Sequence, residues 1–65
     1  MIGTIKSFSR SHGYGFIEAG DDYFFHATEW QSVVFPKAGD RVEFDTKESR
    51  KGVRAINVRR LGDGK

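Results

Sequence analysis

The chain has 65 residues, of which 37% are hydrophobic and 31% charged, with a formal net charge of +2 and no cysteine. A chain of this size forms one domain with a small core. Without cysteine it can form neither disulfides nor thiolate metal sites, and it contains no apolar stretch of the roughly 20 residues that span a membrane. No basic segment followed by an apolar run occurs at the N-terminus, so we expect a cytoplasmic protein.

Short β-favouring segments separated by turn residues follow one another along the chain, whereas helical spacing is poor throughout. The predicted strands are residues 2–9, 14–19, 22–27, 41–46 and 53–60. Gly20 in "AGDD" and Gly52 in "SRKG" are expected to adopt positive φ in tight turns. In the longer loop that follows the third strand, Thr28 is a candidate N-cap for one helical turn containing Glu29 and Trp30. The pattern indicates an all-β barrel or sandwich over residues 1–61, with residues 62–65 as a frayed tail.

Charge is distributed unevenly over these elements. Residues 1–46 carry four basic and seven acidic side chains, a net of −3, whereas residues 47–61 carry six basic and one acidic, a net of +5. The basic segment is either an arm that faces a polyanion or a solvated terminal strand, and charge alone does not decide between the two.

Alternate residues of a strand point to opposite faces, which sorts the aromatic side chains into two groups. The expected core consists of Ile5, Ile17, Tyr23, Phe25, Val42, Phe44, Ile56 and Val58. The opposite parity places Tyr14, Phe16, Phe24 and His26 on the outer face of two adjacent strands, with Lys6 and Phe8 as candidates to join them. Each ring left in water forgoes roughly 1.5 to 3 kcal/mol of burial, so another group is expected to cover them.

Two explanations of the outer rings remain open. In the first, a flanking loop or a partner protein covers them. Separately, Trp30 would either supply an additional stacking ring or plug the barrel beneath the long loop. In the second, the bases of a single-stranded nucleic acid stack on the rings, while its phosphates bind Lys6, Arg10 and Lys51. Gly13 and Gly15 would let such a ligand approach the backbone closely.

Catalytic patterns are missing from the chain. It contains no phosphate-binding loop, zinc-protease helix or nucleophile elbow, and the two histidines have no cysteine partners. Asp21 and Asp22 are expected to be turn residues, with Asp22 offering at most an auxiliary contact to a base edge. We therefore expect no enzymatic activity, metal, cofactor or small-molecule substrate.

Two segments resemble the cold-shock domain family. "GTIKSFSRSHGYGFIE" is similar to the first strand and RNP1-type element of that family, and "DDYFFHAT" is similar to its RNP2-type element. The likeness runs from Gly3 to about Leu61. It implies a five-stranded antiparallel OB-type barrel, with a short helical turn between the third and fourth strands. It also implies binding of single-stranded RNA or DNA without catalysis, as in an RNA chaperone or a modulator of transcription or translation.

The resemblance assigns roles to individual positions. Tyr14 and Phe16 match the RNP1 rings, and Phe24 and His26 match the ring and imidazole of RNP2. Lys6 matches a lysine of the first strand, and Lys51 matches a basic residue before the final strand. Phe35 is a weaker match to an additional stacking ring. The full candidate binding set is Lys6, Phe8, Arg10, His12, Tyr14, Phe16, Asp22, Phe24, His26, Phe35 and Lys51.

Three positions depart from the family pattern: Ser7 replaces a common Trp, Ala27 a Phe and His12 a Lys. At roughly 1 to 3 kcal/mol per stacked base, two missing rings predict weaker binding than in a typical member. The alternative is a protein-interaction barrel, or the N-terminal domain of a larger protein, whose aromatic face meets another domain. We expect a monomer, with a dimer as the alternative.

Overall fold

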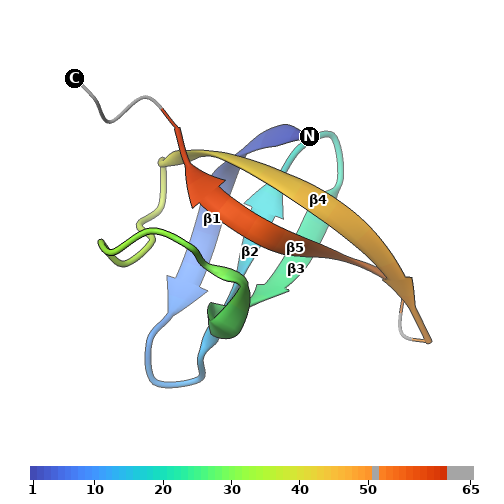
Figure 1. Cartoon of the computed structure of the whole chain (residues 1–65), viewed down its shortest axis with the longest axis horizontal. Helices are drawn as coiled ribbons and strands as arrows, with labels where there is room; N and C mark the ends of the chain where they lie inside the picture. The colour runs from blue at the N-terminus through green and yellow to red at the C-terminus, as the bar shows by residue number, and fades with distance from the viewer. Residues whose placement is uncertain (51, 62–65) are drawn as a thin grey trace.

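Five strands and one short helical turn make up the computed structural model, which describes residues 1–50 and 52–61. The elements are β1 (Ile2–Ser9), β2 (Tyr14–Glu18), β3 (Asp22–His26), the 3-10 turn η1 (Ala27–Glu29), β4 (Arg41–Ser49) and β5 (Gly52–Arg60) (Figure 1). The predicted strands are all present, although β4 runs three residues further than expected. The expected tail, residues 62–65, lies outside the described residues.

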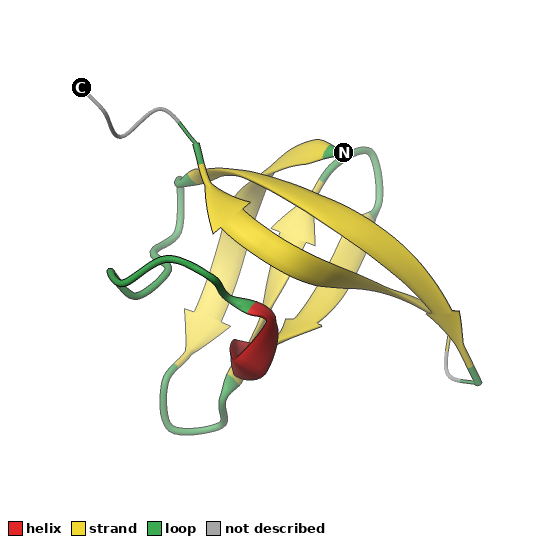
Figure 2. Ribbon diagram, viewed as in Figure 1, coloured by secondary structure: helices red, strands yellow, loops and turns green. Residues whose placement is uncertain are grey.

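The strands close into a barrel in the order β1-β2-β3-β5-β4, with β4 returning to pair with β1. β3 and β5 run parallel, whereas the other neighbouring strands are antiparallel. The expected OB-type barrel is therefore confirmed. Figure 2 shows β4 and β5 as a long hairpin whose tip reaches beyond the other three strands. Gly20 and Gly52 have φ of +88° and +116°, as the tight turns require.

The barrel interior is filled by apolar side chains from every strand. The buried hydrophobic side chains that form the core are those of Ile5, Ile17, Phe25, Val42, Phe44, Ala55 and Val58. Two members of the expected core, Tyr23 and Ile56, are only half-buried. Tyr23 still packs against the core, with its ring centroid 5.5 Å from that of Phe44.

A bulge in β5 explains why Ala55 is buried and Ile56 is not. Glu43 pairs with Arg59 and Asp45 with Ile56, so Phe44 faces two residues of β5. One of these is Asn57, whose φ of +52° is in the left-handed region. An extra residue reverses the alternation of side chains beyond it. The predicted parity of β5 therefore holds at Val58 and is wrong at Ile56.

A second bulge lies in β1 at Lys6. Ile5 pairs with Ile17 and Ser7 with Phe16, which leaves Lys6 as the additional residue. The reversal turns Phe8 toward the interior, where its half-buried ring stacks on Phe25 at 5.8 Å between centroids. The placement of Phe8 among the outer rings was therefore wrong, because simple alternation from Ile5 does not survive the bulge.

Gly15 is needed by the packing of the interior and not by a ligand. A Cβ at Gly15 would lie 2.5 Å from the Ser7 carbonyl oxygen and within 3.0 Å of the rings of Phe8 and Phe25. Gly15 is also buried, so the expectation that it opens the backbone to a ligand is wrong. Gly13 differs, because it has a φ of +76° and nothing within 4 Å of its Cβ position.

The turn η1 and the residue after it close one end of the barrel. The N-cap is His26 and not Thr28, because the His26 side chain accepts a hydrogen bond from the Thr28 amide. Trp30 caps the other end of the turn and packs against the core, 6.3 Å from Phe25 between ring centroids. Its indole Nε1 donates to the Val34 carbonyl at 2.7 Å. Trp30 is therefore the plug beneath the long loop.

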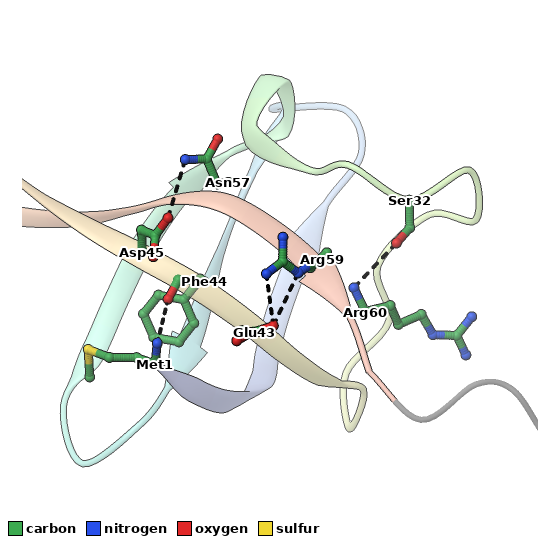
Figure 3. A network of polar contacts seen from close by, with 8 residues as sticks. All are labelled: Met1, Ser32, Glu43, Phe44, Asp45, Asn57, Arg59 and Arg60. Atoms are coloured by element: carbon green, nitrogen blue, oxygen red, sulfur yellow. Dashed lines mark hydrogen bonds and ion pairs between the residues drawn. The ribbon is translucent and has the colours of Figure 1, made fainter.

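Polar contacts hold the outer side of the β4–β5 hairpin, as Figure 3 shows. Glu43 accepts two hydrogen bonds from Arg59, at 2.9 and 3.1 Å. The Asn57 side chain donates to Asp45 at 3.4 Å, and the Arg60 amide donates to the Ser32 hydroxyl at 3.3 Å. Two of the basic residues of segment 47–61 are thus engaged within the barrel, since Arg60 also pairs with Asp40 at 3.5 Å.

Candidate functional site

Three aromatic rings cluster on the outer face of β2 and β3. Phe16 and Phe24 are paired across the two strands, and Tyr14 lies two residues before Phe16 on the same face. The ring centroids are 5.4 Å (Tyr14–Phe24), 5.9 Å (Phe16–Phe24) and 6.2 Å (Tyr14–Phe16) apart. Such separations allow edge-to-face packing, worth about 0.5 to 1.5 kcal/mol per pair, and this packing accounts for the half-burial of the two phenylalanines.

These rings, called the ring cluster below, lie where the parity of the sequence placed them. Tyr14 is exposed, whereas the residues between the rings, Gly15 and Phe25, are buried on the opposite face. The intervening interior residues hold β2 and β3 in register, and this register fixes the positions of the outer rings. The cluster is therefore a preformed aromatic surface.

Two exposed imidazoles border the ring cluster. His26 is the strand partner of Tyr14, and the ring of His12 is 5.8 Å from that of Tyr14. Because His26 Nδ1 accepts the Thr28 amide hydrogen at 3.3 Å, the neutral ring carries its own proton on Nε2. His12 Nδ1 is hydrogen-bonded to the Ser9 hydroxyl at 2.8 Å. Both rings are thereby oriented, and His26 presents an N–H donor on its other side.

The cations expected near the rings have partners within the chain. Lys6 Nζ is 2.8 Å from Asp22 Oδ2, and this hydrogen bond, together with the charge of Asp22, raises the pKa of Lys6 above its ordinary value. The Arg10 guanidinium lies over the Phe35 ring, 4.4 Å from its centroid, in a cation–π contact. Lys51 lies outside the described residues. Lys6 is therefore paired with a carboxylate, whereas Arg10 keeps its charge while it lies over the Phe35 ring.

Phe35 belongs to the loop between η1 and β4. It is 54% exposed and follows two other exposed apolar residues, Val33 and Val34. The Arg10 contact joins this loop to the connection between β1 and β2, and Trp30 anchors it from beneath through Val34. Phe35 therefore lies on a different element from the ring cluster and is linked to the β1–β2 side of the barrel by Arg10.

The positions that depart from the family pattern also lie beside the rings. Ser7 is the strand partner of Phe16 and is exposed, so a small hydroxyl stands next to the ring cluster on the β1 side. Ala27 begins η1 directly after His26 and is half-buried. The aromatic surface is consequently narrow on β1 and ends at His26 on β3.

Two residues beside the cluster were not singled out from the sequence. Arg54 on β5 is the strand partner of Phe24, and Lys47 on β4 is the strand partner of Arg54. Only the parallel pairing of β3 with β5 brings them next to the rings. The excess of positive charge in residues 47–61 indicated that basic side chains could lie near the site. It did not indicate which of the six basic residues face the same side as the rings.

The described part of the chain shows neither a metal-binding cluster nor a membrane-spanning helix. No group of three or more His, Cys, Asp or Glu side chains within residues 1–50 and 52–61 is arranged to hold an ion. Over the same residues, no helix has the length and apolar character needed to cross a membrane.

Comparison with known proteins agrees with this geometry. A family model of the 'Cold-shock' DNA-binding domain matches residues 1–61. The chain is 48% identical to a cold shock-like protein of Aquifex aeolicus, over 94% of each chain. It is 42% identical to the major cold shock protein of Micrococcus luteus, over 92% of this chain and 97% of that protein. Cold shock protein CspC of Bacillus subtilis is 40% identical over 89% of this chain and 94% of its own length.

A solved structure with a similar fold was also found. The structure described as drosophila Unr CSD456 matches 97% of this chain with a TM-score of 0.78 and 28% identity, and the chain spans 27% of that longer chain. The closed barrel is of the OB type, a fold that binds oligonucleotides or oligosaccharides. The chain belongs to the cold-shock domain family.

Proposed function

We propose that this protein binds single-stranded RNA or DNA by stacking successive bases on Tyr14, Phe16, Phe24 and His26. The observation that carries the proposal is the ring cluster, three rings held 5.4 to 6.2 Å apart on one outer face of β2 and β3. Every base has a π-face, so such a surface binds strands of many sequences, at roughly 1 to 3 kcal/mol per stacked base.

The polar groups around the rings give the bound strand its other contacts. His26 Nε2–H donates to a base carbonyl, while Lys6 and Asp22 offer a cation and an acceptor at the opposite end of β3. Because Asp22 already neutralises Lys6, phosphate attraction at that end is weaker than the charge of Lys6 alone suggests. Phe35 provides a further stacking surface, with Arg10 covering one of its faces.

This mode of binding leads to a biological role that needs no catalytic group, cofactor or nucleotide hydrolysis. Stacking on the protein replaces stacking and pairing within RNA, so the protein shifts weak hairpins toward the single-stranded form. We infer that it acts in the cytoplasm as an RNA chaperone or as a modulator of transcription or translation. The absence of large rings at Ser7 and Ala27 makes binding weaker than in members that carry them.

A fluorescence titration of labelled dT and U oligomers at two salt concentrations tests the proposal. Binding should weaken with salt, with a log–log slope of about −2 to −3 if three or four phosphates are neutralised at roughly 0.7 each. Phe16→Ala and Phe24→Ala should each weaken binding about 5- to 150-fold, the equivalent of roughly 1 to 3 kcal/mol. Circular dichroism verifies that the variants remain folded.

Ile2→Ala is the matched control. Ile2 is 53% exposed on β1, but it pairs with Glu43 of β4 and not with a residue of the strands that carry the ring cluster. It should bind like the original protein. Absence of binding at low salt, together with a dimer whose population rises with concentration, would instead identify a protein-interaction barrel.

A further inference from the structure

The ring cluster continues into two cations along one row of paired residues. Phe16 pairs with Phe24, Phe24 with Arg54, and Arg54 with Lys47, so the row crosses β2, β3, β5 and β4. Directly paired residues of neighbouring strands project from the same face of a sheet. Along this row, the outer face therefore carries aromatic side chains on β2 and β3 and basic side chains on β5 and β4.

A hollow lies at the junction of the two halves. It has a volume of about 420 Å³ and is lined by Phe24, Ser49, Val53 and Arg54. Val53 is 45% exposed and adds apolar surface to the lining. The Ser49 hydroxyl donates its hydrogen to the Gly52 carbonyl at 2.7 Å, so it offers the hollow only acceptor lone pairs. Its walls thus include an aromatic ring, an aliphatic side chain, a hydrogen-bond acceptor and a cation.

The two cations lack anionic partners in the part of the chain that the structure describes. Lys6, Arg59 and Arg60 each form an ion pair, but Lys47 and Arg54 form none among residues 1–50 and 52–61. Glu48 does not neutralise them, because it follows Lys47 on the strand and projects from the other face.

Two like charges on directly paired residues destabilise a strand pair. The Lys47–Arg54 pair therefore carries a repulsion that no ion pair among the described residues relieves, and an anion bound between the two side chains would relieve it. A phosphate fits this requirement because it accepts several charge-assisted hydrogen bonds from a guanidinium.

We propose that this hollow is a further nucleotide subsite, in which the base packs against Phe24 and the adjoining phosphate binds Arg54 and Lys47. The subsite rests on the proposed function and extends it, since it lengthens the bound strand from the ring cluster toward the tip of the β4–β5 hairpin (Figure 1). The phosphate contacts come from β4 and β5, not from the cations already paired within the barrel.

The test compares Arg54→Gln with Arg59→Gln, two variants of β5 that lose the same charge. Arg59 is the control because Glu43 holds its guanidinium at 2.9 Å. A series of labelled dT oligomers is titrated with each protein between 50 mM and 400 mM salt. Arg54→Gln should reduce the magnitude of the salt slope by about 0.7, which corresponds to roughly eightfold weaker binding at the lowest salt. Lys47→Gln should act in the same direction.

The length of the oligomer gives an independent readout. Affinity should stop rising about one nucleotide earlier for Arg54→Gln than for Arg59→Gln. In the original protein, the backbone amide NMR signals of Ser49 and Val53 should shift with long oligomers and not with oligomers that only cover the rings.

Equal slopes and equal length dependence for the two arginine variants would overturn the subsite. If Phe16→Ala and Phe24→Ala still weaken binding in that case, the proposed function stands without it. If the original protein binds no oligomer at 50 mM salt, both proposals fall.

Discussion

Substitution of Gly15 by alanine tests the account of how the interior holds the ring cluster in place. The new Cβ would lie 2.5 Å from the Ser7 carbonyl oxygen, where ordinary contact begins at 3.4 Å, a shortfall of about 0.9 Å. It would also lie 2.9 and 3.0 Å from carbon atoms of Phe8 and Phe25, shortfalls of about 0.5 and 0.4 Å. A paired carbonyl cannot rotate away as a side chain can, so β1 and β2 must separate locally.

Overpacking of this kind costs about 1 to 3 kcal/mol, and contact with backbone places Gly15→Ala near the upper limit. A domain of 65 residues has a stability of about 3 to 10 kcal/mol, so the loss is a large share of the total. At about 4 to 8 °C per kcal/mol, the melting temperature should fall by roughly 10 to 20 °C. The fluorescence of Trp30, the single tryptophan, reports unfolding because its ring packs against Phe25.

Gly13→Ala is the control. Gly13 has a φ of +76° but open space around its Cβ position, so alanine there should cost only the left-handed conformation, about 1 to 2 kcal/mol. The reasoning fails if Gly15→Ala is as stable as the original protein, or if it loses less stability than Gly13→Ala in urea titrations followed at Trp30.

Two further predictions concern groups outside the core. Because the folded pKa of Lys6 is raised by Asp22, the pair stabilises the barrel fully below the ordinary value of 10.5 and progressively less as pH rises through the folded pKa. The urea midpoint of Asp22→Asn should therefore lie below that of the original protein at pH 8, and the difference should shrink as the pH rises above 10.5; a constant difference would contradict this linkage. Asn57→Ala should be about 1 to 2 kcal/mol less stable than Asn57→Gly, because both lose the Asp45 contact and only alanine opposes the φ of +52°. Thermal melts of the two variants decide this, and equal melting temperatures would contradict the role assigned to the bulge.

The arrangement of the ring cluster follows from local sequence. Tyr14, Phe16 and Phe24 alternate with buried Gly15 and Phe25, and a strand of period two has only two faces. Turn glycines bound each strand at nearly the expected place. These properties depend on the backbone of a few neighbouring residues, so they can be predicted before the chain is folded.

Other features were decided only when the barrel closed. The bulge at Lys6 turns Phe8 toward the interior, and the bulge at Asn57 places Ala55 in the core instead of Ile56. Each bulge adds one residue to its strand, so the side chains beyond it point to the face opposite the one that simple alternation predicts. Strand order then placed Arg54 beside Phe24, although thirty positions separate them. The local sequence thus determines which side chains share a face of a strand. The partner of each residue on the next strand depends on register and strand order, which only the packed barrel determines.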